Sequence, residues 1–292
     1  MAPEDDEAPI PTDYEIAQAA EMEPIWELVE PWGLGLDDLQ YFGSYTAKVK
    51  QHAIDRLREQ AADREGNLVL VTGMTPTPMG EGKTVTTVGL GQTLNHLGED
   101  AMIAIREPSL GPVFGVKGGA AGGGRSQVLP MEEINLHFTG DLHALTSAHN
   151  LISAMLDAKL TKDRDFDVGV TDVRWPRAID MNDRALRAMV IGLDGKTGGT
   201  PREENFLLTA ASELMAALCM AEDLADLKER IGRIIVAYDR DGDPVTVDDI
   251  DATGAATMLL RDAIKPNVVQ TIEGTPAFVH GGPFANIAHG TN

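Results

Sequence analysis

Thr75-Pro76-Thr77-Pro78-Met79-Gly80-Glu81-Gly82-Lys83-Thr84 is the stretch that decides the fold. An apolar, partly β-branched run from Asn67 to Val71 precedes it and predicts a buried strand, and Val85 to Leu97 has helical periodicity. A glycine-rich turn between a strand and a helix points backbone N–H groups and the positive end of the helix dipole at one place, which suits an anionic phosphate. The stretch therefore predicts a nucleotide phosphate site.

The motif departs from the usual P-loop pattern G-x-x-x-x-G-K-[ST] at one position, because Thr77 stands where that pattern has glycine. In the P-loop interpretation, Lys83 reaches the outer phosphates and the Thr84 hydroxyl is placed for Mg²⁺. An ordinary strand-to-helix turn is the alternative. The nucleotide-binding residues expected from the loop are Thr77, Pro78, Met79, Gly80, Glu81, Gly82, Lys83 and Thr84.

Composition limits the class of protein. The chain has 292 residues, 43% of them hydrophobic, which is enough for a large core and two domains. Lys and Arg total 24 against 46 Asp and Glu, a net charge of -22, which argues against a nucleic-acid-binding surface. No apolar run approaches the ~20 residues of a membrane span, and the amino end lacks a signal pattern. We therefore expect a cytoplasmic protein without a membrane partner.

The acidic residues are dispersed along the chain, and their mutual repulsion is tolerable where salt screens it. This favours adaptation to a salty cytosol. The only cysteine, Cys219, lies in an apolar stretch, so we expect a buried helix position rather than a nucleophile.

Helix alternates with buried strand along the chain, which is typical of an α/β protein with a parallel sheet. Helices are expected at Tyr14 to Val29, Tyr45 to Ala61, Val85 to Leu97, Leu142 to Leu156, Asp183 to Val190, Asn205 to Met220, Ala225 to Ile231 and Val247 to Ile264. Strands are expected at Asn67 to Val71, Ala101 to Ile105, Arg233 to Ala237 and Asn267 to Ile272. The predicted fold is a P-loop NTPase-like parallel sheet domain with a second α/β domain.

The expected division has four parts. Residues 1–12 form a mobile lead-in, residues 13–120 begin the nucleotide-binding domain, residues 121–285 form the second α/β domain, and residues 286–292 return toward the first. After the strand that ends at Ile105, a long glycine-rich segment runs to Arg125. Because open α/β sheets bind ligands at the carboxyl ends of their strands, we interpret this segment as a site loop, with an interdomain hinge as the alternative.

Several long strings occur in order along the chain. Besides the phosphate loop, they are Arg106 to Pro112, Lys117 to Gly124, Asn135 to Asp141, Asp180 to Arg187 and Thr275 to Gly290. Together they closely resemble formate-tetrahydrofolate ligase, from about Tyr14 to Asn292. The resemblance also accounts for Thr77, because the family's own phosphate loop has that form.

The resemblance implies an ATP-dependent ligation in two steps, with ATP and Mg²⁺ as cofactors. Formate attacks the γ-phosphate to give formyl phosphate, and N10 of tetrahydrofolate then attacks the formyl carbon to give 10-formyltetrahydrofolate. Phosphoryl transfer depends on positioning and on neutralising charge, which suits the cations Lys83, Arg106 and Lys117. By motif position, Lys83 holds the β- and γ-phosphates and Arg106 grips formate and the intermediate. The alternatives are a salt bridge from Arg106 to Glu107 and a solvated Lys117.

Glu107 and Asp141 match acidic active-site positions of the family. The roles open to them are holding a monovalent cation, orienting the folate amine or accepting its proton. Surface or helix-capping carboxylates are the alternative. His137 lies in the string that ends at Asp141 and either lines the site or is structural. The spacing of His137, His143 and His149 does not fit a helical zinc site.

The chain departs from the family in two respects. Arg125 stands where the family's glycine loop commonly has an aromatic residue, and the chain ends about halfway through a typical member. The second half carries the folate-stacking pocket in relatives, and relatives assemble as homotetramers. The expected partners are therefore formate, tetrahydrofolate and either further copies of the chain or a chain that supplies the second half. A non-catalytic split subunit and another P-loop NTPase are the alternative functions.

Overall fold

A computed structural model describes residues 10–63, 66–73, 80–114, 121–195 and 198–282. Its helices are α1 (Asp13–Gln18), α2 (Ile25–Val29), α3 (Gln51–Gln60), α4 (Lys83–His96), α5 (Leu110–Val113), α6 (Met131–Asn135), α7 (Asp141–Lys162), α8 (Glu213–Met220), α9 (Leu224–Gly232) and α10 (Thr253–Leu259). Short 3-10 helices are η1 (Glu30–Trp32), η2 (Leu36–Asp38), η3 (Arg184–Arg187) and η4 (Thr209–Ala211). Its strands are β1 (Leu39–Tyr41), β2 (Ala47–Val49), β3 (Ile103–Ile105), β4 (Gly122–Gly123), β5 (Ser126–Leu129), β6 (Val168–Val173), β7 (Arg177–Ile179), β8 (Met189–Ile191), β9 (Arg202–Glu204), β10 (Phe206–Leu208), β11 (Ile235–Asp239), β12 (Pro244–Thr246), β13 (Asn267–Thr271) and β14 (Pro276–Val279).

The largest sheet has the strand order β1-β2-β13-β14-β3, and β5 joins it through β13. The α/β class is confirmed, but the sheet is mixed. Strand β3 pairs in parallel with β14, whereas β1 with β2, β2 with β13 and β13 with β14 are antiparallel. Strands β13 and β14 form a hairpin, and strands joined by so short a turn must run in opposite directions.

Both faces of this sheet are covered. Successive side chains of a strand point to opposite faces, so Val268 packs with the apolar residues of α2 and α3, and Val269 packs with Val88 of α4. Helix α4 approaches the sheet closely, because a Cβ at Gly91 would overlap the Ile103 side chain of β3. These contacts fix the helix that follows the phosphate loop against the strand that precedes Arg106.

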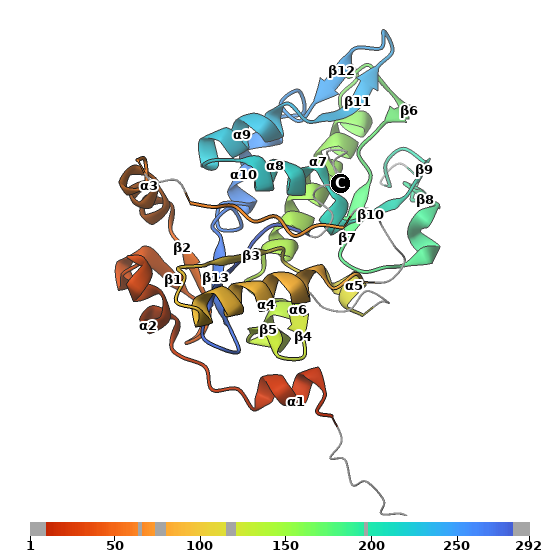
Figure 1. Cartoon of the computed structure of the whole chain (residues 1–292). Helices are drawn as coiled ribbons and strands as arrows, with labels where there is room; N and C mark the ends of the chain where they lie inside the picture. The colour runs from red at the N-terminus through yellow and green to blue at the C-terminus, as the bar shows by residue number, and fades with distance from the viewer. Residues whose placement is uncertain (1–9, 64–65, 74–79, 115–120, 196–197, 283–292) are drawn as a thin grey trace, which may run out of the picture.

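A second core lies beyond the sheet. Helices α7 to α10 pack there with the antiparallel strands β6, β11 and β12, and α7 contributes the fully buried Leu145, Ile152 and Leu156. In Figure 1, α7 runs from the large sheet to this second group of elements. The predicted domain boundary between residues 120 and 121 stays a prediction, but the sheet connects segments from both sides of it. Strands β5, β13 and β14 come from residues 121–285 but lie in the same sheet as β2 and β3.

Several expected elements are present. Helix α4 matches Val85 to Leu97, α7 extends the expected Leu142 to Leu156, and α9 covers Ala225 to Ile231. Strand β3 lies within Ala101 to Ile105, β13 matches Asn267 to Ile272, and β11 overlaps Arg233 to Ala237.

Other predicted helices are wrong in part, because they merge two elements. Residues 14–29 form α1 and α2, which are separated near Pro24. Residues 45–61 form β2 followed by α3, and residues 205–220 form β10, η4 and α8. Residues 183–190 form η3 and part of β8, and of residues 247–264 only α10 is an α-helix. In each case the strand or turn is stabilised by pairing or packing with distant segments, which helical periodicity does not detect.

The expected buried strand at Asn67 to Val71 is also wrong. These residues form no strand, and Leu68 and Leu70 are 94% and 79% exposed. An apolar run becomes a strand only where another strand offers hydrogen bonds, and no described segment pairs with this one. Figure 1 shows it crossing the molecule as an extended trace.

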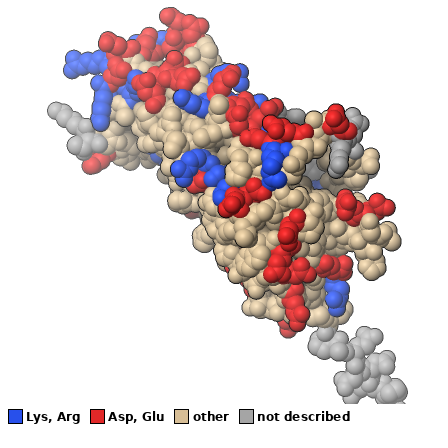
Figure 2. Space-filling model, turned by 90° about the vertical axis from the view of Figure 1, so that its left-hand side faces the viewer, with Lys and Arg blue, Asp and Glu red and all other residues tan. Residues whose placement is uncertain are grey.

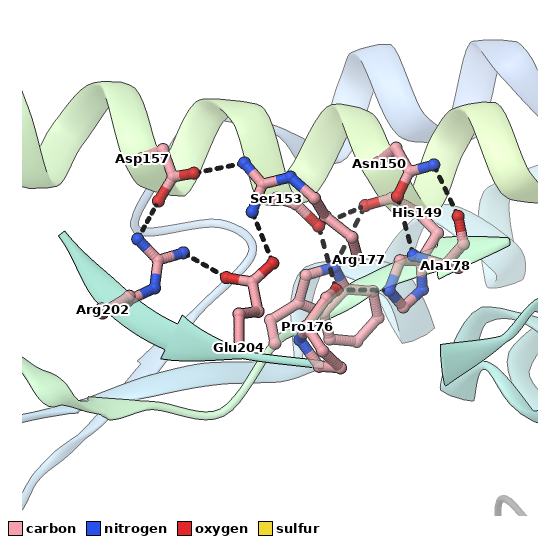
Figure 3. A network of polar contacts seen from close by, with 10 residues as sticks. His149, Asn150, Ser153, Asp157, Pro176, Arg177, Ala178, Arg202 and Glu204 are labelled. Atoms are coloured by element: carbon pink, nitrogen blue, oxygen red, sulfur yellow. Dashed lines mark hydrogen bonds and ion pairs between the residues drawn. The ribbon is translucent and has the colours of Figure 1, made fainter. Parts of the chain in front are cut away.

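A polar network ties strands β7 and β9 to α7 (Figure 3). Arg177 and Arg202 each bridge Asp157 and Glu204, with Arg177 to Glu204 at 2.5 Å and Arg202 to Glu204 at 2.6 Å. Arg202 and Glu204 have only 6% and 4% of their side chains exposed. Two cations and two anions balance, so the network anchors these strands without net charge.

His149 lies next to this network and has a structural role. Its Nδ1 lies 2.8 Å from the Ser212 hydroxyl and its Nε2 lies 2.7 Å from the Pro176 carbonyl oxygen. A carbonyl only accepts, so Nε2 carries the hydrogen and Nδ1 accepts from Ser212. The ring stacks on Trp175 at 4.2 Å between centroids. Burial lowers the pKa of His149 to about 4, so the ring is neutral at pH 7.

The low pKa of His149 predicts acid sensitivity. As the pH falls below 6.5 the unfolded chain binds a proton here, whereas the folded chain does so only near pH 4, so stability falls across this window. His149 accounts for at most about 3 kcal/mol of the free energy of unfolding that is lost across this window. Urea unfolding at several pH values measures the free energy of unfolding as a function of pH. Between pH 6.5 and pH 4 this free energy should fall less steeply in His149→Gln than in the wild type. The control, His143→Gln, alters an exposed residue of the same helix and should keep the wild-type slope. An unchanged slope in His149→Gln would contradict the neutral, buried ring.

The surface is predominantly acidic. Figure 2 shows acidic side chains along the whole of one face, with basic side chains beside them mainly in its upper part. In the part of the chain that the structure describes, no helix has the length and apolar character needed to span a membrane.

The charge of -22 predicts that salt stabilises the fold. Raising KCl from about 0.1 M to about 1 M shortens the Debye length from about 10 Å to about 3 Å and weakens repulsion between surface carboxylates. We expect the midpoint of urea unfolding to rise over this range. Sucrose at the same osmolality, which does not screen charge, should raise it less. A midpoint that does not rise with KCl would contradict adaptation to salt.

Candidate active site

The carboxyl ends of β3 and β14 lie side by side, because the two strands pair in parallel up to Ile105 and Val279. The pairing continues past both ends. His280 N donates to the Ile105 carbonyl at 3.0 Å, and Glu107 N donates to the Gly281 carbonyl at 2.6 Å. Arg106 and Glu107 therefore leave the sheet beside the segment that follows β14. Arg106 is exposed, whereas Glu107 is 3% exposed.

Glu107 lies near a second buried carboxyl group. This is Asp141, the first residue of α7, which is 5% exposed and whose charge acts on Glu107. Gly140 precedes Asp141 with φ of 90°, a backbone conformation that glycine adopts without strain. Burial, and next the charge of Asp141, hold the pKa of Glu107 well above its ordinary value. Of the predicted site residues, the structure brings these two together.

Sequence reasoning did not identify the basic residue that pairs with Asp141. Lys48 lies on β2 with no exposed surface, and its Nζ donates to Asp141 Oδ2 at 2.7 Å and to the Lys265 carbonyl at 3.0 Å. Asn267, at the start of β13, donates from Nδ2 to the same Asp141 oxygen at 2.9 Å. A lysine between Ala47 and Val49 was the available signal, but residues 45–61 had been predicted to be a helix.

His280 is a further group at this edge that sequence reasoning did not single out. Its Nδ1 is buried and has no hydrogen-bond partner among the described residues. Burial lowers the pKa of His280 to about 4, so its ring is neutral. The pKa of His280 also responds to the charges of Asp141 and Lys48, which places the ring in the same electrostatic environment.

Two of the sequence strings named in the sequence analysis, Arg106 to Pro112 and Asp180 to Arg187, lie next to each other beside Glu107. The Ser109 hydroxyl donates to Asp180 Oδ1 at 2.5 Å, and Leu110 N donates to Asp180 Oδ2 at 3.3 Å. Gly111 packs against Asn182 so closely that a Cβ there would lie 2.6 Å from the amide oxygen. The loop after β7 therefore holds the segment that follows Arg106, and the charge of Asp180 also raises the pKa of Glu107.

The phosphate loop is described from Gly80 onward. Gly82 has φ of 71° and precedes α4, whose amino end receives no side-chain cap. Lys83 is exposed in the first turn, and Thr84 is partly exposed. Helix α4 and β3 are joined by the short segment 97–102 and run in opposite directions, so the amino end of α4 lies at the same edge as Arg106 (Figure 1). Thr77, Pro78, Met79 and Lys117 lie outside the described residues.

A family model described as formate-tetrahydrofolate ligase matches residues 11–292. The chain belongs to the formate-tetrahydrofolate ligase family. It is 84% identical over 271 residues to the formate-tetrahydrofolate ligase of Haloarcula marismortui, an alignment that covers 93% of this chain and 49% of the relative. It is 79% identical over 282 residues to that of Haloquadratum walsbyi, with 97% of this chain and 49% of the relative covered. The corresponding relative in Symbiobacterium thermophilum is 59% identical over 281 residues, with 96% of this chain and 50% of the relative covered. The chain thus spans about half the length of these curated relatives.

The remaining site predictions have mixed outcomes. His137 is exposed in the turn before α7, and His143 is exposed on that helix. Part of the expected site loop is instead a hairpin, in which Gly122 and Gly123 pair with β5, and Gly124 N donates to Asp13 Oδ1 at 2.7 Å. Arg125, which departs from the family's glycine loop, lies exposed at the tip of this hairpin.

Cys219 lies in α8 as expected, but the prediction that it is buried is wrong. It is the penultimate residue of the helix and is followed by the exposed Met220. Although the residue as a whole is exposed, its sulfur lies against Gly281, and burial of this atom raises the pKa of the thiol. A raised pKa disfavours the thiolate, which agrees with the expectation that Cys219 is not a nucleophile.

Proposed function

We propose that this chain supplies the ATP and formate sites for the ligation of formate to tetrahydrofolate, giving 10-formyltetrahydrofolate, ADP and phosphate through formyl phosphate. The observation that carries the proposal is the position of Arg106. It leaves the carboxyl end of β3 beside the Glu107–Asp141 pair, at the edge where α4 begins. Open α/β sheets bind their ligands at such an edge.

In this proposal the amino end of α4 receives the phosphates. Lys83 holds the β- and γ-phosphates, and residues 77–84 form a P-loop NTPase-like cradle. The lack of a side-chain cap on α4 supports this role, because its first N–H groups are then available to an anion. Thr84 stands in that first turn and would hold Mg²⁺, which neutralises phosphate charge when bound. Lys117 would add a third cation.

Arg106 would grip formate and then the formyl phosphate. A guanidinium forms two parallel hydrogen bonds to a carboxylate or a phosphoryl group, which an ammonium cannot do. Glu107 and Asp141 would act beside it, on the folate amine or its proton, and their oxygens are also the candidate ligands of a monovalent cation. His137 is a less direct candidate, because it is exposed four residues before Asp141.

Replacing Arg106 with alanine should lower formate-dependent ADP release by about 10³-fold, the scale seen when a charge-stabilising arginine is lost from phosphoryl transfer. ATP binding, measured by calorimetry, should change little. Arg106→Lys should recover only part of the activity, because it keeps the charge and loses the fork. Formate-dependent turnover that survives in Arg106→Ala would refute the assigned role.

Tetrahydrofolate binding is the part of the proposal that depends most on chain length, since the chain spans about half of its relatives. The second candidate is a split subunit that binds nucleotide and needs a complementary chain. The test is ADP release in the presence of formate and tetrahydrofolate, with and without the carboxyl-terminal half of the Haloarcula marismortui relative. Activity only in the mixture supports the split subunit. ATP hydrolysis at a rate that does not depend on formate or tetrahydrofolate would indicate another P-loop NTPase.

The assembly and location belong to the same proposal. We expect a cytoplasmic homo-oligomer, a tetramer as in the family, or a complex with the second half. The domain division is proposed in a revised form, with residues 265–282 grouped with the nucleotide-binding part, because β13 and β14 pair with β2 and β3. Residues 286–292, the proposed return segment, lie outside the described residues.

A further inference from the structure

A pocket of about 450 Å³ lies beside the second core, among β10, β11, the start of α8 and the segment between β6 and β7. Its volume is within the range of small-molecule sites in proteins. In the described part of the chain, none of the residues that line it belongs to the candidate active site. The ligation of formate therefore does not account for this pocket.

Part of the lining is apolar or has its polar atoms already paired. The Trp175 Nε1 donates to the His149 carbonyl at 3.1 Å. Both ring nitrogens of His149 are in hydrogen bonds, one of them to the Pro176 carbonyl (Figure 3). Ile235 and Leu207 add aliphatic surface, and Ile235 is 39% exposed. This part of the pocket suits an apolar group, because burying such a group here leaves no polar atom unpaired.

Arg174 supplies a positive charge to the pocket and is held in place by two contacts. Its Nη1 donates to the Thr171 carbonyl at 3.0 Å. Its guanidinium carbon lies 5.9 Å from the centre of the Tyr238 ring, which also lines the pocket and attracts a cation. A guanidinium has several N–H donors, and that of Arg174 makes only this one hydrogen bond to the described residues. The other donors can therefore bind a carboxylate.

Glu213 supplies the opposite charge. It is the first residue of α8, and among the described residues its carboxylate has no hydrogen-bond or ion-pair partner, Arg174 included. The Ser212 hydroxyl already caps the helix by accepting from Leu214 N, so Glu213 is not needed for capping. Burial raises the pKa of Glu213, and no neighbouring charge offsets this rise. A carboxylate in this position would be stabilised by a cationic group of a ligand.

We propose that this pocket binds a free α-amino acid with an apolar side chain, whose carboxylate pairs with Arg174 and whose ammonium group pairs with Glu213. Two opposite charges that line one pocket without pairing with each other match a ligand that carries both charges. A ligand with one charge would leave the other protein charge shielded from water and unpaired. The apolar side chain lies against Ile235 and Leu207. The proposal does not rest on the proposed function, because the two sites share no described residue.

Calorimetric titration of the 292-residue chain with L-leucine and L-phenylalanine tests the proposal. The amino acid that binds more tightly is compared with two analogues, one without the ammonium group and one without the carboxylate. For leucine these are 4-methylpentanoate and 3-methylbutylamine, and for phenylalanine 3-phenylpropanoate and 2-phenylethylamine. Each analogue should bind about tenfold more weakly or worse, because one charged contact is lost.

Two results of these titrations would overturn the proposal without any variant. One is a chain that binds neither amino acid at about 10 mM, a concentration at which a site of millimolar affinity is mostly filled. The other is an analogue that binds as tightly as its parent amino acid, since one of the two charged contacts would then contribute nothing.

Variants show whether the amino acid binds in this pocket. Glu213→Gln and Arg174→Gln alter exposed residues, and each should weaken binding by about tenfold or more. The matched controls are Glu222→Gln and Arg261→Gln, which remove the same charges from exposed residues outside the pocket and should keep the wild-type affinity. Wild-type affinity in either pocket variant, or an equal loss in its matched control, would overturn the assignment.

Discussion

Replacing Lys83 with alanine is expected to lower formate-dependent ADP formation by roughly 10²–10³-fold, the effect of removing one electrostatic group from a preorganised site. Lys83 begins α4 at an amino end without a side-chain cap, so in the proposed site its ammonium and the helix dipole act on the same phosphates. The measurement is the initial rate of ADP release at saturating ATP, together with ATP affinity by calorimetry. ATP affinity should fall as well, which separates Lys83→Ala from Arg106→Ala.

Lys228→Ala is the matched control for Lys83, because Lys228 is an exposed lysine of α9. It removes the same charge from the chain and should leave both the rate and ATP affinity unchanged. A Lys83→Ala protein that retains wild-type turnover would mean that the phosphates bind elsewhere.

Replacing Asp141 with asparagine is expected to destabilise the fold by about 3–5 kcal/mol, the cost of leaving a buried charge without its partner. Asparagine has nearly the same shape, so the loss comes from Lys48, which would keep a buried ammonium group with no exposed surface. Urea unfolding in high salt measures the change. Asp163→Asn is the control, since Asp163 is 41% exposed, lies 4.0 Å from Lys159 and should cost less than about 1 kcal/mol.

The double variant Lys48→Met with Asp141→Leu should recover part of the loss, because two apolar side chains in place of an ion pair leave no buried charge. A loss below about 1 kcal/mol in Asp141→Asn would show that water or another group already compensates Lys48. The buried ion pair would then not organise this edge of the sheet.

The elements that sequence reasoning predicted well are those with strong local signals. Helix α7 carries Leu145, Ile152 and Leu156 at helical spacing, and all three are fully buried. Strand β13 has the β-branched pair Val268 and Val269 at its centre and is buried along its whole length. In both cases the local pattern and the tertiary environment agree, so the pattern was sufficient.

Sequence reasoning failed where distant segments decide the local structure. Strand β2 is held by β1 and by β13, which is more than two hundred residues away, and its Lys48 is buried only because Asp141 lies opposite. The run at Leu68 shows the reverse error, because its apolar character predicted a buried strand and its backbone has no partner in the described part of the chain. Hydrophobic pattern alone does not supply the missing hydrogen-bond partner.

The candidate site was predictable to a similar extent. The resemblance to the family gave Arg106, Glu107 and Asp141, and the structure buries Glu107 and Asp141 close enough for the charge of Asp141 to act on Glu107. It did not single out Lys48, Asn267 or His280, because their importance comes from the pairing of β2, β13 and β14 around Asp141. The roles of Thr77, Pro78, Met79 and Lys117 stay predictions, since these residues lie outside the described part of the chain.

The central claim is that this edge of the sheet supports a mixed anhydride of formate and phosphate. The most direct measurement uses formate labelled with ¹⁸O, together with ATP and tetrahydrofolate, and analyses the phosphate released by mass spectrometry. The second half of the Haloarcula marismortui relative is added if the chain alone is inactive. If formate oxygen attacks the γ-phosphorus and the formyl carbon is later attacked by nitrogen, one formate oxygen remains on the phosphate. We predict one labelled oxygen per phosphate in step with 10-formyltetrahydrofolate. Product formed without label in the phosphate would contradict the account.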